Sequence, residues 1–388
     1  MSVEKFNLLS FTGKMKTLHL SWIAFFITFM VWFNMAPLKG AIVDGVGLTL
    51  SEWKTLLIIN VALTIPARVI IGALTDKFGP RIVYSALMAI CSIPCFMFAL
   101  ADSFAQLLIA RFALGCIGAG FVVGIRMVSE WFPPKELGTA EGVYGGWGNF
   151  GSAAAAFTLP TIAILFGGED GWRYAVGITG LMSLLFSFVY YKNTTDTPKG
   201  STYFRPKNLG GMEVTSVGDF YLLLVMKTPM YLALALPQGV SLLGEDVTLA
   251  IYLGLSALYV YDAYLTYKVN KDLFTTPVAE VHRYSFKQVA VLNILYFATF
   301  GSELAVVSML PAFFAETFEL NMATAGLLAG MYAFMNLMSR PGGGLISDRF
   351  GRRKTLLILT AGLAVGYFCL SLIDATWSIW LAVVAVMA

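Results

Sequence analysis

Two stretches of this chain follow one pattern, in which an arginine stands four residues before a glycine and eight before an aspartate. They read Arg68-Val-Ile-Ile-Gly72-Ala-Leu-Thr-Asp76-Lys-Phe-Gly79-Pro-Arg81 and Arg340-Pro-Gly-Gly-Gly344-Leu-Ile-Ser-Asp348-Arg-Phe-Gly351-Arg-Arg353. Each arginine lies inside an apolar run. The pattern predicts two fixed positive charges at matching depths in an apolar interior, an arrangement that suits an anion.

The composition around these motifs is that of a membrane protein. Of the 388 residues, 58% are hydrophobic and 13% are charged, which leaves too little polar surface to cover a soluble protein of this size. The net charge is only +3, so we expect no nucleic-acid partner. The four cysteines lie in apolar segments, and both histidines are distant from them in sequence, so we expect no metal and no cofactor.

Apolar runs of about 20 residues, long enough to cross a bilayer, define the predicted helices. Six lie near 18–38, 54–75, 82–101, 105–126, 138–166 and 173–191. Two weaker runs follow near 219–238 and 248–267, then strong runs near 288–315, 323–347 and 354–373, and a last one from Trp377. The first run is too long for a signal peptide, so we expect it to remain uncleaved.

Basic loops alternate with acidic or neutral loops along the chain. The basic segments are the N-terminus with Lys5, Lys14 and Lys16 and the loops 77–81, 192–207, 268–287 and 349–354. The acidic or neutral loops are 167–170, 244–246, 316–319 and the one at Asp374. Because basic loops stay on the cytoplasmic side, we predict a cytoplasmic N-terminus and a multi-pass protein of the plasma membrane, the inner membrane in a bacterium. The segment 219–267 either crosses as a hairpin or lies at the interface, since both preserve the alternation.

The repeated motif resembles the loop motif of the major facilitator superfamily, and Arg111-Phe-Ala-Leu-Gly115 resembles that superfamily's fourth-helix motif. The resemblance implies an all-α membrane fold with two pseudo-symmetric six-helix halves, a central cavity and alternating access. The expected parts are an N-terminal half at 1–191, a linker with two additional apolar segments at 192–286, and a C-terminal half at 287–388. The last part holds core helices seven to part of ten, so we expect a truncated second half and a fragment.

A glycine-rich run in the fifth span resembles the fifth-helix motif of the nitrate/nitrite porter family, and the details are most similar to its cyanobacterial members. The run is Gly142-Val-Tyr-Gly145-Gly146-Trp-Gly148-Asn149-Phe-Gly151. Taken alone it indicates close helix packing, but Asn149 adds an amide that can donate to an oxyanion. The segments 296–302 and 339–343 resemble the family's seventh and eighth core helices.

This resemblance implies that two arginines clamp the anion, two phenylalanines sandwich or gate it, and three residues line its site. They are, in that order, Arg68 and Arg340, Phe121 and Phe300, and Tyr296, Asn149 and Gly145. The alternatives are ordinary core packing for the aromatic residues and an internal carboxylate or carbonyl partner for each arginine. A further Gly-Asn motif is expected in an eleventh helix beyond Ala388.

Helix geometry places both arginines near the membrane midplane, because eight residues at 1.5 Å put each about 12 Å from its aspartate. A central charge costs about 3 kcal/mol on insertion scales. The two cations repel each other until an anion binds, and each attraction is then about 4 kcal/mol at ~4 Å and an effective dielectric of about 20. The planar guanidinium suits a planar oxyanion.

Glu303 is the one carboxylate deep in a core span. Inward movement of a monovalent anion opposes an interior-negative potential by about 2.3 kcal/mol per 100 mV, so accumulation needs a driving ion. Burial favours the protonated form of a carboxyl group, so Glu303 is predicted to couple proton entry to anion entry. The alternative is that it only neutralises Arg340 or another cation.

Five further charged residues of the motifs are predicted to serve as gate and scaffold: Asp76, Asp348, Arg111, Arg81 and Arg353. Helix ends offer them partners whose contacts can break and reform between states. Arg126 and Glu130, spaced i to i+4, are expected to form an interfacial ion pair.

The sequence therefore predicts a monomeric secondary transporter, not an enzyme, whose partners are the bilayer, protons and nitrate, with nitrite as a second substrate. It would serve nitrate assimilation by proton symport. A nitrate/nitrite exchanger or a carrier of another small anion would keep the same fold. A nitrate-binding membrane sensor is the alternative of another class, and it would need a soluble output domain that no segment is long enough to supply.

Overall fold

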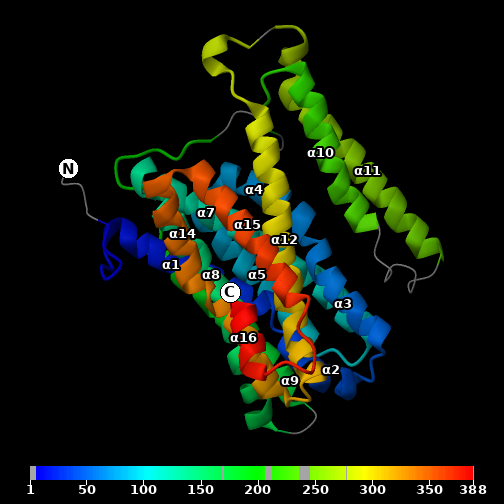
Figure 1. Ribbon diagram of the computed structural model, residues 1–388. Coiled ribbons are helices and arrows are strands. Elements are labelled where there is room, and N and C mark those ends of the chain that lie inside the picture. Colours follow the sequence, from blue (N-terminus) through cyan, green and yellow to red (C-terminus); the bar gives the residue numbers. More distant parts are fainter. Residues whose placement is uncertain (1–5, 168–169, 206–211, 236–244, 277, 388) are drawn as a thin grey trace.

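A computed structural model describes residues 6–167, 170–205, 212–235, 245–276 and 278–387, and every regular element in these ranges is a helix (Figure 1). The first part contains α1 (Gly13–Trp32), η1 (Ala36–Leu38), α2 (Lys39–Val46), α3 (Leu50–Ala62), α4 (Thr64–Phe78), α5 (Pro80–Ala99), α6 (Phe104–Leu114), η2 (Gly115–Ala119), α7 (Gly120–Trp131), α8 (Pro134–Phe166) and α9 (Gly171–Asn193). The rest contains α10 (Val217–Ala235), α11 (Glu245–Asn270), η4 (Lys271–Phe274), η5 (Glu280–His282), α12 (Phe286–Thr317), α13 (Met322–Phe334), α14 (Asn336–Phe350), α15 (Arg352–Leu370) and α16 (Ile379–Met387).

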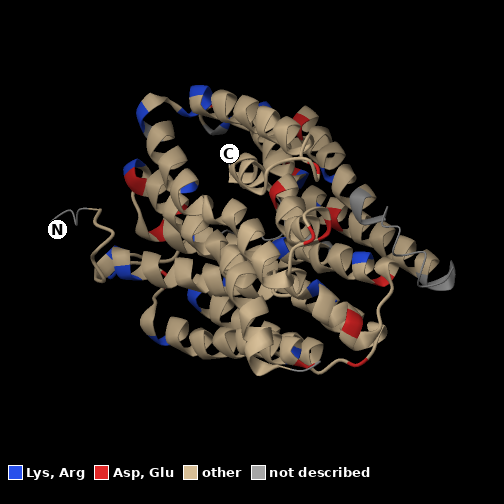
Figure 2. Ribbon diagram, turned by 60° about the horizontal axis from the view of Figure 1, so that its bottom comes forward, with Lys and Arg blue, Asp and Glu red and all other residues tan. Residues whose placement is uncertain are grey.

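Within the described residues, 10 helical segments are long and apolar enough to cross a membrane. They include all six spans predicted before residue 192 and the three strong spans predicted after residue 287. Figure 2 shows that charged residues gather toward the ends of the helices and that long central stretches carry none. The prediction of an all-α polytopic membrane protein is confirmed.

Three of the predicted spans are interrupted rather than continuous. The second span divides into α3 and α4, the fourth contains the 3-10 segment η2, and the span after α12 divides into α13 and α14. In the second span the break falls near Pro66, which has no backbone N–H for the carbonyl of Ala62. The fourth span loosens where glycines stand at 115, 118 and 120, since glycine is a weak helix former.

The repeated motif takes the same structure twice. Arg68 is the fifth residue of α4 and Arg340 the fifth residue of α14, and each helix begins directly after a break. Each then ends at a glycine with positive φ, 88° at Gly79 and 95° at Gly351. Such values favour glycine, which has no Cβ. The equal offsets place the two arginines at matching positions in their helices.

Helix α8 connects the two parts of the bundle, because it packs against α1 and α9 and also against α13 and α14. Glycines make the contact with α14 possible. A Cβ added at Gly142 would lie 2.8 Å from the carbonyl oxygen of Arg340, and one added at Gly146 would overlap the carbonyl oxygen of Asn336. The glycine-rich run is therefore a packing face between α8 and α14.

The loops 77–81 and 192–205 meet at one end of the bundle, which we call the basic end. The carboxylate of Asp196 accepts a hydrogen bond from the backbone N–H of Arg81 (2.8 Å) and fills the space beside Gly79. The hydroxyl of Tyr203 donates to the carbonyl oxygen of Thr75 (2.9 Å), and burial raises the pKa of this hydroxyl. These contacts attach the start of the linker to the first six spans.

At the opposite end, the segments before and after the linker meet closely. Lys39 forms an ion pair with Glu316 of α12, and η1 packs against α8, α12 and α13. The void beside Pro37 and Pro311 measures only about 10 Å³. These contacts hold the segments before and after the linker together at this end.

Helices α10 and α11 run side by side at the edge of the bundle, next to α12 (Figure 1). Lys227 of α10 contacts Asp262 and Thr266 of α11, each at 2.8 Å. The segment Thr248–Phe274 is long and apolar enough to cross a membrane. Crossing by this pair as a hairpin stays a prediction, and residues 236–244 lie outside the described part.

The contact between α8 and α14 predicts the effect of two matched substitutions. Gly146→Ala should destabilise the protein by about 1–3 kcal/mol, because the new methyl group meets a backbone carbonyl that cannot turn aside. Gly177→Ala in α9 should be neutral or stabilising, because nothing lies within 4 Å of its added Cβ. Thermal unfolding of both variants in detergent measures the difference. Equal melting temperatures would show that α8 and α14 do not pack this closely.

Candidate functional site

The guanidinium group of Arg68 lies among aromatic rings. Its central carbon is 4.9 Å from the ring centroid of Phe300 and 5.6 Å from that of Phe121. Its single hydrogen bond in the described part is a long one, 3.5 Å from Nη1 to the hydroxyl of Tyr296. The Nε and Nη2 atoms are buried without a hydrogen-bond partner among the described residues. The rings attract the cation through their faces, but the described residues supply no acceptor for these two nitrogen atoms.

The three aromatic residues around Arg68 stack on one another. The ring centroids of Phe121 and Phe300 are 5.9 Å apart, and those of Tyr296 and Phe300 are 5.2 Å apart, with interplanar angles of 18° and 12°. Phe121 comes from α7, whereas Tyr296 and Phe300 come from α12. The stack therefore joins helices from before and after the linker.

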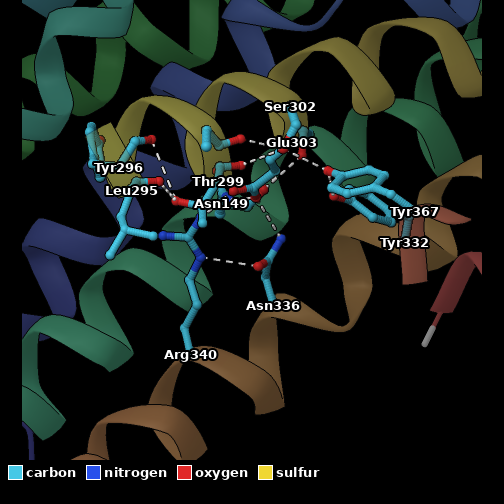
Figure 3. Close-up of polar contacts among 12 residues, drawn as sticks. Asn149, Leu295, Tyr296, Thr299, Ser302, Glu303, Tyr332, Asn336, Arg340 and Tyr367 are labelled. Carbon is cyan, nitrogen blue, oxygen red and sulfur yellow. Dashed lines mark hydrogen bonds and ion pairs between the residues drawn. The ribbon is translucent and has the colours of Figure 1, made fainter. Parts of the chain in front are cut away.

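Arg340 has a different environment, because a carboxylate already neutralises it. Its Nη2 lies 2.5 Å from Oε2 of Glu303, and its Nε donates to Oδ1 of Asn336 at 3.0 Å (Figure 3). Gly145 faces the same guanidinium, since an added Cβ would lie 3.5 Å from Nη1. The predicted alternative of an internal carboxylate partner thus holds for Arg340, and no carboxylate in the described part pairs with Arg68.

The Glu303 carboxylate receives three donors. Besides Arg340, the side-chain amides of Asn149 and Asn336 both donate to its Oε1, Asn336 at 3.0 Å (Figure 3). The Glu303 side chain is only 13% exposed. A buried carboxylate is tolerated where donors and a cation surround it, and here they come from α8 and α14.

The structure thus brings together the seven residues predicted to bind an anion. The two arginines and Glu303 all act electrostatically on the Tyr296 hydroxyl. Gly145, Arg340 and Phe121 line one cavity of about 480 Å³. These contacts join α4, α7, α8, α12 and α14, which are distant in sequence.

Two polar residues near Arg340 were not identified from the sequence. Asn336 stands four residues before Arg340 in α14, and this spacing places both on one helix face. Glu141 stands four residues before Gly145 in α8 and lines the same cavity. The spacing could have indicated both residues, but only the packing of the helices shows that Asn336 lines the cavity that reaches Glu303, whereas Glu141 lines the cavity that contains Arg340.

A second cavity of about 480 Å³ reaches Glu303 between α12 and α15. The hydroxyl of Tyr367 donates to Ser302 at 2.8 Å and lies 3.5 Å from the hydroxyl of Tyr332 (Figure 3). Glu303 lines this cavity but not the cavity that contains Arg340, and Arg340 lines only the latter. Ser339 and Leu359 line both cavities, so the two spaces adjoin beside this ion pair.

Arg111 lies apart from this cluster, fully buried in α6. Its Nη1 donates to Oδ1 of Asn34 at 2.9 Å, and its Nη2 donates to the carbonyl oxygen of Trp32. The ring centroid of Phe98 lies 5.5 Å from the guanidinium carbon. These contacts link α6 to the C-terminal end of α1, which fits a scaffold role.

The other predicted gate residues lie at the basic end. Asp76 is 3.9 Å from Nε of Arg126, whose Nη2 forms the predicted i,i+4 ion pair with Glu130 at 2.9 Å. Arg81 donates from Nε to the carbonyl oxygen of Tyr191 at 2.8 Å, and Arg353 is exposed. The side chain of Asp348 lies outside the described part.

The described residues contain no group of three or more His, Cys, Asp or Glu side chains that could hold a metal ion. All four cysteines are free thiols.

Comparison with known proteins identifies the family of this chain. The sequence profile of the Major Facilitator Superfamily matches residues 21–388. The chain is 49% identical to the nitrate/nitrite transporter NrtP of Picosynechococcus sp. over 98% of this chain and 77% of that protein. It is 45% identical to NrtP of Nostoc punctiforme over 98% of this chain and 79% of that protein. These relatives are transporters and not enzymes, as expected for this chain.

The fold is also that of solved transporters. The partially occluded, inward-open xylose transporter XylE from E. coli superposes with a TM-score of 0.59 at 15% identity, over 96% of this chain and 80% of that one. At this identity the match concerns the fold alone. Together, the profile and the close relatives show that the chain belongs to the major facilitator superfamily and, within it, to the nitrate/nitrite porter family.

Proposed function

We propose that this protein takes up nitrate, with nitrite as a second substrate, by proton symport across the plasma membrane. The observation that carries the proposal is the Arg68 guanidinium, with two buried nitrogen atoms that find no acceptor among the described residues. It lies in a cluster with a second arginine whose acidic partner can be neutralised by a proton. The names of the close relatives support nitrate and nitrite as substrates.

The basic end would face the cytoplasm, because lysine and arginine are retained on that side. The ion pair of Lys39 with Glu316 and the small void beside Pro37 then close the external side. In alternating access the substrate site opens to one side at a time. We infer that the structure represents a state closed to the outside. We also infer that the protein acts as a monomer, with an N-terminal half at 1–191 and a C-terminal half at 287–388.

A small planar oxyanion suits the surroundings of Arg68. The guanidinium presents its N–H groups in a plane and can bind an oxyanion through two parallel hydrogen bonds. The stacked rings of Phe121 and Phe300 leave little room for a bulky substrate. Nitrate has three oxygen atoms in one plane, so one oxyanion could accept from both arginines while the rings cover its faces.

Glu303 competes with the anion for Arg340. While the carboxylate is ionised, it occupies the guanidinium and two amide donors. When a proton neutralises Glu303, the attraction to Arg340 falls, and Arg340 becomes available to the anion. The Oδ1 atom of Asn149 is buried without a partner in the described part, and a turn of this amide would offer it to the new carboxylic O–H. Proton binding and anion binding would therefore favour each other.

Charge counting gives the direction of coupling. With Glu303 ionised, the two arginines and the carboxylate carry a net charge of +1, and a proton raises it to +2. One nitrate then restores +1, so a proton and an anion enter together with no change in the net charge of the site. An exchanger would not reorient readily with an empty site, and it would therefore need a bound anion in each direction.

The rival functions give different results in vesicles. A nitrate/nitrite exchanger would show nitrite-dependent nitrate flux without a pH gradient. A carrier of another small anion would transport that anion and not nitrate. A sensor would bind nitrate without flux. Nitrate accumulation driven by a pH gradient, acid outside, would support the proposed symport against all three.

The two arginines predict the first functional result. Arg68→Lys and Arg340→Lys should each weaken nitrate binding at least tenfold, because an ammonium cannot present two coplanar donors to an oxyanion. Titration calorimetry on the purified variants measures Kd. Arg205→Lys, at an exposed position in the linker, is the matched control and should bind as the unmodified protein does. Unchanged binding in both test variants would remove the arginines from the site.

Glu303 predicts a pH dependence. In the unmodified protein, nitrate Kd should rise with pH, because the ionised carboxylate competes for Arg340. In Glu303→Gln the Kd should no longer depend on pH, and uptake should no longer respond to a pH gradient. Glu319→Gln, at an exposed carboxylate between α12 and α13, should keep both responses. Gradient-driven uptake that survives Glu303→Gln would contradict the coupling role.

A further inference from the structure

The cavity beside Arg340 contains a second carboxylate, that of Glu141. The cavity measures about 480 Å³ and is bounded by α7, α8, α14 and α15. Among its lining residues in the described part, Arg340 and Glu141 are the charged ones. The others include the apolar side chains of Phe121, Ile125 and Leu359. An anion that leaves Arg340 through this space must pass a carboxylate.

Glu141 follows the binding residues along one face of α8. Glu141, Gly145 and Asn149 are spaced by four residues, which places them one above another on the helix. Gly145 faces the Arg340 guanidinium, so the backbone of Glu141 lies about 6 Å further along α8. This direction leads toward the start of α8, which lies at the basic end. There Glu136 holds Lys14 of the N-terminal segment at 2.5 Å.

The Glu141 carboxylate has no direct contact with a charged or hydrogen-bonding partner in the described part. It forms no hydrogen bond or ion pair within the described residues, and its electrostatic neighbour is Arg352, the first residue of α15. Arg340 is the other charge in its cavity. The surrounding apolar walls weaken screening and so strengthen the effect of a charge on an ion in the same cavity. A carboxylate that Arg352 only partly neutralises therefore disfavours an anion at Arg340.

We propose that Glu141 is a release residue, whose negative charge lowers the affinity for the bound anion when the site is open toward the basic end. Arg352 limits this effect by partly neutralising Glu141. The inference rests on the proposed function for the identity of the anion. It differs from the role of Glu303, which competes for the guanidinium by direct contact.

A release residue answers a physical problem of the two-arginine site. Two permanent cations and a set of amides could hold an anion too tightly for turnover, and conduction requires binding that is weak enough to leave. A carboxylate one turn away weakens binding without occupying the site. Turnover then gains where release limits the rate.

The experiment compares charge changes of opposite sign. In Glu141→Gln, nitrate Kd should fall about fivefold, as expected for loss of one nearby charge in a partly solvated cavity. The KM and the maximal rate of uptake should fall together, because the anion binds more tightly and leaves more slowly. In Arg352→Gln, Kd should rise, because Glu141 is then less neutralised. Titration calorimetry on purified protein and nitrate uptake into vesicles provide these values.

Two further variants control for structural effects. Glu141→Asp keeps the charge, so its Kd should stay within about twofold of the unmodified protein. Glu280→Gln removes an exposed carboxylate outside the cavity and should change neither Kd nor KM. Each variant is first compared with the unmodified protein in thermal unfolding.

The outcomes separate this inference from the proposed function. If the unmodified protein binds nitrate but Glu141→Gln leaves Kd unchanged or raises it, Glu141 is not a release residue, while the nitrate site stands. If Glu141→Gln and Arg352→Gln shift Kd in the same direction, the effect is structural and the inference is wrong. If the unmodified protein binds no nitrate, both proposals are overturned.

Discussion

The Glu303 carboxylate is the interaction on which the arrangement of the site depends. It takes one arginine and two amides from α8 and α14, so it fixes α12 against both helices. It also makes the two arginines unequal. Arg340 is neutralised by direct contact, whereas Arg68 is left among aromatic faces with unpartnered nitrogen atoms. The site therefore combines a cation that a carboxylate neutralises with one that has no carboxylate partner among the described residues.

Close packing of α8 on α14 makes this interaction possible. Without side chains at Gly142 and Gly146, the two backbones approach until Asn149 reaches Glu303 and Gly145 faces Arg340. The glycine-rich run thus serves packing and the site together. The two interpretations considered from the sequence are not exclusive, because the small residues that allow the contact also place the amide.

Acidic groups surround Arg340 at two distances. Glu303 touches the guanidinium, while Glu141 shares its cavity without touching it. Under the proposed roles, the competition of Glu303 for Arg340 would depend on the protonation of Glu303, whereas the charge of Glu141 would lower the affinity for the anion from a distance. In a membrane interior, where an unpaired cation costs several kcal/mol, Glu303 offsets the charge of Arg340, whereas no carboxylate in the described part offsets that of Arg68.

Hydropathy, loop charge and the repeated motif were sufficient to predict the helical fold, because a span needs only a run of apolar residues and these are local features of the chain. The recurrence of the arginine motif predicted two equivalent helices, and α4 and α14 indeed share their break, their arginine position and their terminal glycine. Motif resemblance was sufficient to select seven residues that the fold brings together. Spacing along a helix indicates only which residues share one face. Tertiary packing alone decided that Glu303 pairs with Arg340 and not Arg68. It also decided that the Asn336 amide donates to Glu303 and that Glu141 lines the cavity beside Arg340. These outcomes depend on distances of a few ångströms between helices far apart in sequence, and no local pattern encodes such distances.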